Sequence, residues 1–176
     1  MADAERVIQL PYRGAPQTVA VIRQAALASQ KHYGVRQLAE LACERLASKD
    51  YLSEILAILN LISARTRYMR DPRTVELVRA PHLVAKGIAG GRIPSLDCDD
   101  MSASLAALLL SVGCEVRAVT VAFQHLHYMG QRQYTHVFVE AKEPKSGTWI
   151  ACDPVAGEKT GEMLRRAVAA KTWPIA

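Results

Sequence analysis

The stretch "SLDCDDMSASLAALLLSVGC", residues 95–114, sets three acidic residues around one cysteine and follows them with a long apolar run. The apolar surface of this run is nearly continuous, which predicts a buried central helix. We expect the helix to begin at Asp97 or Cys98 and to end at Gly113, since glycine commonly follows a helix. Asp99 and Asp100 then fall in its first turn, where carboxylates interact favourably with the helix dipole.

The segments on either side differ in their periodicity. Before residue 95, apolar residues recur at helical spacing in three stretches, 17–32, 35–48 and 51–69. The first 16 residues read as an extended lead-in, and residues 70–94, rich in Pro and Gly, as a long connection with at most one short helix at 82–88. After Gly113 the period changes to two, which predicts strands at 115–123, 134–141 and 148–155, followed by a terminal helix at 161–173. This order predicts an α+β fold, with an antiparallel sheet packed on the central helix.

Composition excludes several classes of function. Half of the 176 residues are hydrophobic and the net charge is +5, but no basic arm and no interleaving of basic with aromatic residues predicts nucleic-acid binding. No apolar run is long enough to cross a membrane, and we expect no signal peptide. The four cysteines (Cys43, Cys98, Cys114 and Cys152) form no CxxC pair. We therefore expect free thiols in a reducing, cytoplasmic setting.

Cys98 is a candidate nucleophile because of its place at the start of the central helix. Backbone N–H groups at a helix N-terminus favour a thiolate and can stabilise a developing oxyanion. Carboxylates beside a thiol have the opposite effect, because they raise its pKa. We therefore expect the sulfur to face a histidine, while the side chains of Asp99 and Asp100 point away from it.

His136 and Asp153 are the candidate partners of Cys98. His136 opens the predicted strand "THVFVE", in which His136, Phe138 and Glu140 share one face. Asp153 closes the next strand, where Pro154 prevents further pairing. If these two strands are neighbours, the end of one lies beside the start of the other. The expected arrangement is a cysteine nucleophile, a histidine base and an aspartate that orients the imidazole.

Three motifs together, "RYMRDPRTVELVRAPHLVAKG", "DCDDMSASLAALLLSVGCEVRAV" and "THVFVEAKEPKSGTWIACDPV", resemble the transglutaminase-like superfamily of papain-like cysteine enzymes. The similarity is greatest to its compact bacterial and phage-associated members. It implies a single domain over 1–176, with a papain-like catalytic core at 50–176 and a helical extension at 1–49. It further implies a Cys98–His136–Asp153 triad that acts on amide or ester bonds of a protein or peptide substrate without a cofactor. Tyr68 and Asp97 are then auxiliary groups near the oxyanion.

Two alternatives stay open at this point. The extra N-terminal helices and the basic first half also fit a non-catalytic interaction module, such as a phage or prophage assembly component with a relic triad. His125 and His127 are spaced as metal ligands on a strand face can be, with the acidic cluster at residues 97–100 as a source of oxygens. Hydrolysis and transamidation share the same triad, and the sequence does not choose between them.

Overall fold

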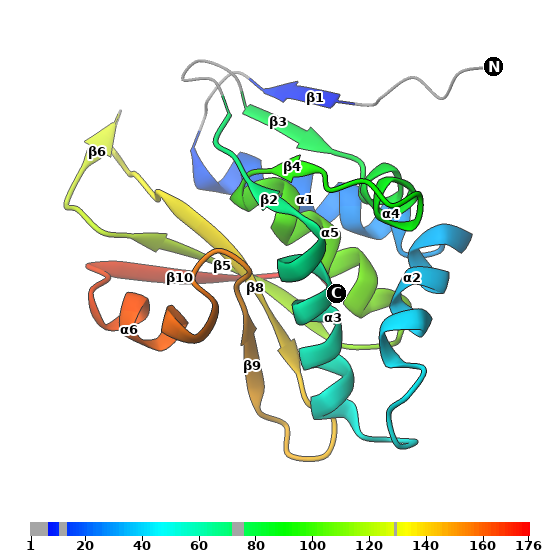
Figure 1. Cartoon of the computed structure of the whole chain (residues 1–176). Coiled ribbons are helices and arrows are strands. Elements are labelled where there is room, and N and C mark those ends of the chain that lie inside the picture. The colour runs from blue at the N-terminus through cyan, green and yellow to red at the C-terminus, as the bar shows by residue number, and fades with distance from the viewer. Residues whose placement is uncertain (1–6, 11–13, 72–75, 129) are drawn as a thin grey trace.

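A sheet of four antiparallel strands carries helices on both of its faces, with most of them on one side (Figure 1). The computed structural model describes residues 7–10, 14–71, 76–128 and 130–176. The helices are α1 (Ala15–Ser29), α2 (Tyr33–Cys43), α3 (Tyr51–Arg65), α4 (Pro81–Ala89), α5 (Cys98–Ser111) and α6 (Thr160–Arg165). None of the helices described is both long and apolar enough to cross a membrane.

The main sheet has the strand order β10-β5-β8-β9, and each neighbouring pair is antiparallel. Its strands are β5 (Val116–Ala122), β8 (His136–Lys142), β9 (Trp149–Cys152) and β10 (Ala169–Pro174). Three smaller pairs lie outside it. They are β1 (Val7–Leu10) with β3 (Glu76–Arg79), β2 (Arg67–Tyr68) with β4 (Ser95–Leu96), and β6 (His127–Tyr128) with β7 (Gln131–Arg132).

Helix α5 is the centre of the core. It contacts α1, α2, α3 and α4 as well as strands β5 and β8, and its residues from Asp99 to Leu109 are all buried. Small residues such as Ala103, Ala106 and Ala107 let the neighbouring elements approach closely, while Leu105 and Leu109 fill the space between them. The prediction of a buried central helix is confirmed.

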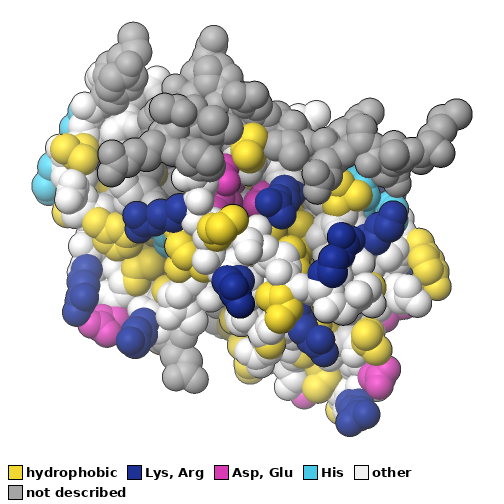
Figure 2. Space-filling model, turned by 45° about the horizontal axis from the view of Figure 1, so that its top comes forward, with side chains coloured by type: hydrophobic (Ala, Val, Ile, Leu, Met, Phe, Trp, Pro, Cys, Tyr) yellow, Lys and Arg dark blue, Asp and Glu magenta, His cyan; other side chains and the backbone are white. Residues whose placement is uncertain are grey.

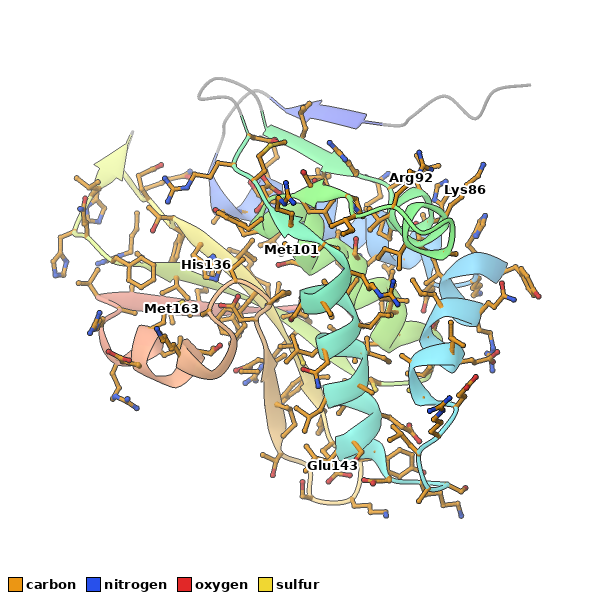
Figure 3. All side chains as sticks on the ribbon, in the orientation of Figure 1. Lys86, Arg92, Met101, His136, Glu143 and Met163 are labelled. Carbon is orange, nitrogen blue, oxygen red and sulfur yellow. The ribbon has the colours of Figure 1, made fainter. Side chains whose placement is uncertain are left out.

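The two faces of the main sheet pack against different partners. Val137 and Val139 of β8 belong to the large hydrophobic cluster that contains α5. Phe138 points the other way and packs with β5 residues and with Met163 and Leu164 of α6. Figure 3 shows His136 and Met163 on this same side of the sheet. The predicted alternation along β8 is therefore confirmed, and it places the candidate base on the α6 side.

Strand β9 is shorter than β8, which leaves part of β8 without a ladder partner. The pairing runs from Lys142↔Trp149 to Val139↔Cys152 and goes no further. Pro154 follows soon after and has no N–H to donate, so the ladder cannot continue. The backbone of Val137 lies beyond the end of β9, and the first turns of α5 pack there instead.

The C-terminal segment differs from its prediction. A helix was expected over residues 161–173, but α6 ends at Arg165, and residues 169–174 form strand β10 along the free edge of β5. The Ala-rich sequence favours a helix locally, whereas pairing with β5 satisfies a whole strand edge. The Trp173 indole N–H also donates to Thr120 Oγ1 across the pair (3.0 Å).

The connection over residues 70–94 contains more structure than expected. The short helix predicted at 82–88 is present as α4. Strand β3 in this segment was not predicted, nor were β2 just before it and β4 just after it, because these strands are short and pair with distant parts of the chain. Residues 72–75, in the same connection, lie outside the described residues.

Replacing Leu105 by Ala tests the central position of α5. The side chain is fully buried, so the substitution removes apolar contacts, leaves a cavity and lowers the free energy of unfolding by about 2–5 kcal/mol. The matched control is Leu41→Ala on α2, where the leucine is 60% exposed and the change stays within about 0.5 kcal/mol. Urea denaturation measures both, and equal effects at the two positions would contradict this account of the core.

Candidate active site

Asp97 fixes the position at which α5 begins. Its backbone is extended, and its Oδ1 accepts hydrogen bonds from the N–H groups of Asp99 (3.0 Å) and Asp100 (2.9 Å). Its own carbonyl accepts from Met101 N–H (3.1 Å). Asp97 is therefore the N-cap, and Cys98 is the first helical residue. Two of the N–H groups that could bind an oxyanion are already occupied by this cap.

The thiol of Cys98 lies at the edge of β8, where β9 has ended. The N–H of Val137 donates to the sulfur, and one helical turn later Ser102 Oγ donates to the Val137 carbonyl (3.2 Å). Both backbone groups of Val137 are thus bonded to side chains of α5. Because Val137 follows His136 directly, this seating brings the thiol and the imidazole to the same end of β8.

The expected direction of Asp99 is wrong. The Cys98 thiol donates to Asp99 Oδ1 at 3.5 Å, so a carboxylate lies against the sulfur. Asp100 does point away, as expected: its Oδ1 accepts from the Arg79 N–H (2.6 Å), and its Oδ2 lies 3.8 Å from the Arg79 guanidinium. Asp99 is itself buried beside the sulfur, and this side-chain packing is not encoded in the local sequence pattern.

The surroundings of Cys98 favour the protonated thiol. Burial raises its pKa well above the usual value, the carboxylates of Asp99 and Asp97 raise it further, and the Val137 N–H opposes them. At neutral pH the resting sulfur is therefore a neutral thiol. A group that accepts its proton is required before it can act as a strong nucleophile.

His136 and Asp153 form a close, buried pair. His136 Nε2 lies 2.7 Å from Asp153 Oδ2, and the side chain of Asp153 is fully buried while that of His136 is 11% exposed. A carboxylate accepts, so the proton of this bond belongs to Nε2 and the lone pair of the neutral ring belongs to Nδ1. The ring also stacks at 6.1 Å on Phe138, which restricts its rotation.

The turn after β9 orients the carboxylate of Asp153. Asp153 Oδ1 accepts from the N–H groups of Val155 (2.9 Å) and Ala156 (3.1 Å), which leaves Oδ2 for the imidazole. Pro154 lies between Asp153 and Val155 and has no N–H that could compete for the carboxylate. The sequence "DP" thus ends the strand and at the same time fixes the orientation of the side chain.

Cys98, His136 and Asp153 lie at one end of β8, but they do not form one continuous chain of hydrogen bonds. In the described part of the chain, no hydrogen bond links the Cys98 sulfur to the His136 ring. Tyr68, which is 41% exposed, stands on β2 opposite Leu96 of β4. Burial is the main cause that raises the pKa of its hydroxyl, and the Cys98 and Asp97 charges add to it, which places Tyr68 within electrostatic reach of the thiol.

The remaining candidates lie elsewhere. Cys152 is fully buried in the main core, and burial raises its pKa to about 12. Cys114 is half-buried, with its pKa raised to about 11 by the same cause. His125 lies on the loop before β6 and His127 begins β6, and both side chains are exposed. Among the described residues, no three His, Cys, Asp or Glu side chains are grouped as a metal site.

Sequence reasoning missed the contribution of Val137 and Ser102. Val137 contributes only backbone groups, the Ser102 hydroxyl donates to one of them, and their contact depends on where β9 stops. Ser102 lies four residues after Cys98, on the same face of α5. A hydroxyl one helical turn after the cysteine was the available signal, although Ser104 shows that polar residues also occur elsewhere in this helix.

Comparisons with known proteins find similarity in the fold but not in the sequence. No protein-family model matches the sequence, and a search of curated proteins finds no relative. A crystal structure from Parabacteroides distasonis ATCC 8503, described as a "putative protease", aligns with a TM-score of 0.60 and 14% identity over 93% of this chain and 30% of that one. A "putative cysteine protease" from Cytophaga hutchinsonii aligns with a TM-score of 0.47 and 18% identity, over 80% of this chain and 46% of that one. This chain thus spans less than half of either protein.

Replacing Asp99 by Asn should make Cys98 more reactive. The carboxylate raises the pKa of the thiol, so its removal lowers that pKa and increases the thiolate fraction at pH 8, about tenfold for each unit. The rate of iodoacetamide labelling, followed by mass spectrometry of the Cys98 peptide, measures this. Asp100→Asn is the control, because that carboxylate faces Arg79. A rate for Asp99→Asn no higher than that of the unmodified chain would show that the contact does not suppress the thiol.

Asp100 gives a second prediction, on stability against pH. Burial raises its pKa from 3.8 to about 6. The folded state therefore binds this proton more tightly than the unfolded chain, and unfolding becomes easier as pH rises through that interval. The stability of Asp100→Asn relative to the unmodified chain should increase by up to about 1.4 kcal/mol per pH unit between these values and level off above them.

Urea denaturation at a series of pH values from about 4 to 7.5 measures this difference. Ser102→Ala, which removes a non-titrating buried group from the same helix, should give an offset that is constant with pH. A constant offset for Asp100→Asn as well would contradict the prediction.

Proposed function

We propose that this protein is a cysteine-dependent acyl-transfer enzyme that acts on amide bonds, with Cys98 as nucleophile, His136 as general base and acid, and Asp153 as the residue that orients the imidazole. The observation that carries the proposal is the buried His136–Asp153 pair (2.7 Å) at the end of β8 where the Cys98 thiol is seated. The resemblance of the sequence to transglutaminase-like enzymes supports it, as does a fold shared with a protein described as a "putative protease".

The proposed reaction steps follow from the position of the proton on Nε2 of His136. With that nitrogen bonded to Asp153, the neutral ring can accept the thiol proton at Nδ1 as the sulfur attacks the carbonyl carbon. The tetrahedral oxyanion collapses, the C–N bond breaks, and the imidazolium returns the proton to the leaving amine. Water, or a second amine, then attacks the thioester with His136 as base. The free thiol and a carboxylic acid, or a new amide, are the products.

Donors for the oxyanion are few in this arrangement. Asp97 already binds the N–H groups of Asp99 and Asp100, which leaves the N–H of Cys98 itself at the start of α5. The hydroxyl of Tyr68 is the proposed second donor, because its pKa responds to the charge at Cys98. Asp97 contributes through the cap, since a carboxylate can only accept.

The contact between Cys98 and Asp99 favours a second candidate, a non-catalytic interaction module. A thiol that donates to a buried carboxylate at 3.5 Å is stabilised in its unreactive form. In such a protein, the His136–Asp153 pair is a structural hydrogen bond between β8 and the end of β9. The basic first half of the chain and its packing on α5 then serve an assembly partner, such as a phage or prophage component.

Activity on peptides separates the two. Incubation with a mixture of synthetic peptides and a fluorescent primary amine, read by mass spectrometry, detects both cleavage and amine transfer. We expect Cys98→Ala to abolish the activity, His136→Ala to lower it by about 10²–10⁴-fold, and Asp153→Asn to lower it without abolishing it. Cys43→Ala, at a thiol beside α3, is the matched control and should be fully active. Product formation by Cys98→Ala would contradict the proposed enzyme. So would an equal rate of iodoacetamide labelling of Cys98 in the unmodified chain and in His136→Ala, and either result would favour the non-catalytic interaction module.

A further inference from the structure

Exposed cations without a carboxylate partner are concentrated between the end of α3 and the end of α4. Among the described residues from 65 to 93, every exposed charged side chain is cationic, and none forms an ion pair with another described residue. We call these five side chains the basic surface: Arg65, Arg67, Arg70, Lys86 and Arg92. Its positive charge is therefore uncompensated by the chain around it.

Backbone hydrogen bonds join the segments that carry the basic surface. The N–H of Arg92 donates to the carbonyl of Gly87 (3.0 Å), which turns the chain back onto the end of α4. Figure 3 shows Lys86 and Arg92 at this end of the helix. The carbonyl of Pro94 accepts from the N–H of Arg67 (2.9 Å), where the parallel pairing of β2 with β4 begins. The basic surface thus continues from α4 to β2 over adjoining segments.

The β2–β4 pair also connects the basic surface to the candidate active site. Arg67 stands opposite Ser95, three residues before Cys98. Its Cα therefore lies within about 15 Å of that of Cys98, with about 5 Å between the strands and at most about 10 Å along the chain. Burial is the main cause that raises the pKa of the Tyr68 hydroxyl, a hydrogen bond from Arg70 lowers it, and the charge at Cys98 raises it. The basic surface thus reaches a side chain that lies near the thiol.

Helix dipoles account for only part of this arrangement. Arg65 lies in the last turn of α3 and Lys86 in the last turn of α4, where a cation interacts favourably with the carbonyl end of the helix. Arg67 and Arg92 lie outside both helices. Neither a helix dipole nor an ion pair within the described chain explains their positions, so a ligand of negative charge is the remaining partner.

The hydrophobic side chains among these cations fit a polypeptide ligand. Tyr68, Met69 and Ile93 are 41%, 54% and 60% exposed, and Figure 2 shows basic side chains interspersed with hydrophobic ones on the face that includes β2, with fewer acidic ones. Tyr, Met and Arg are enriched at protein interfaces. Single-stranded nucleic acids instead need several aromatic rings for base stacking, and Tyr68 is the one Phe, Tyr or Trp in residues 65–93. An acidic polypeptide therefore fits this surface better than a nucleic acid does.

We propose that the basic surface binds an acidic segment of the polypeptide substrate and so holds the amide bond to be attacked at Cys98. This inference rests on the proposed function. The carboxylates lie about five residues from that bond, because an extended chain advances about 3.3 Å per residue. Arginine binds a carboxylate through parallel N–H···O bonds, which adds orientation to charge. Salt weakens the interaction, since exposed charges are screened.

Fluorescence anisotropy of rhodamine-labelled peptides tests the binding without requiring turnover. Each probe is an acetylated and amidated peptide in which a run of alanines is followed by a run of glutamate, glutamine or lysine. The unmodified chain at low salt should bind the glutamate peptide about tenfold more tightly than the glutamine peptide, and the lysine peptide no better. This preference should shrink at about 0.5 M salt. Equal affinity for the glutamate and glutamine peptides at low salt would overturn the proposal.

Two double variants decide whether the basic surface is the binding site. Arg67→Gln with Arg92→Gln should weaken binding of the glutamate peptide about tenfold, while circular dichroism confirms that the variant is folded. Arg36→Gln with Arg166→Gln removes the same charge from exposed arginines on α2 and at the end of α6, and should bind as the unmodified chain does. An equal loss in both variants would reduce the effect to net charge and overturn the proposal. Tighter binding of oligo(dT) than of the glutamate peptide would overturn it in favour of a nucleic acid.

Two further measurements separate this inference from the proposed function. The bound glutamate peptide should slow iodoacetamide labelling of Cys98, and binding without slower labelling would place the peptide away from the candidate site and overturn the proposal. Cys98→Ala should bind the peptide as tightly as the unmodified chain. A chain that cleaves or transfers peptides without this binding contradicts the role of the basic surface alone. Binding without any activity contradicts the proposed enzyme and assigns the surface to the interaction module.

Discussion

The seating of the first turn of α5 on the open edge of β8 is the constraint on which the candidate site depends. Asp97 caps the helix through two N–H groups, so Cys98 can only be its first residue. Ser102 and Cys98 then bond the two backbone groups of Val137. Because Val137 adjoins His136, a shift of α5 by one residue would move the sulfur away from the end of β8 that carries the imidazole. The geometry of the site is thus set by backbone contacts that involve no catalytic side chain except the thiol.

Much of this arrangement could be predicted from the sequence, for local reasons. The apolar run of residues 101–110 has no polar face, so it had to be a buried helix. The period of two around Phe138 defines which side chains share a face of the sheet, and Pro154 defines where the last strand can pair no further. These features follow from residues close together in the chain, and they bring His136 and Asp153 onto neighbouring strands.

The features that could not be predicted depend on distant partners. Ala169, Ala170 and Lys171 favour a helix, and pairing with the free edge of β5 makes them part of a strand. The direction of Asp99 is set by its packing beside the sulfur, and one rotamer change would move that carboxylate away and weaken its effect on the pKa of the thiol. A sequence pattern places a charge near a cysteine, but it does not define on which side of the sulfur the charge lies.

The early end of β9 has a further consequence, for the solubility of the protein. An unpaired strand edge in a sheet is a template for association with other chains, and proteins cover or interrupt such edges. Here the cover over Val137 is the helix that carries the candidate nucleophile. Any change that loosens the start of α5 would therefore expose the unpaired edge of β8 to other chains and would also disrupt the candidate site. Selection against aggregation would then preserve the geometry around Cys98 even in a descendant that had lost its chemistry.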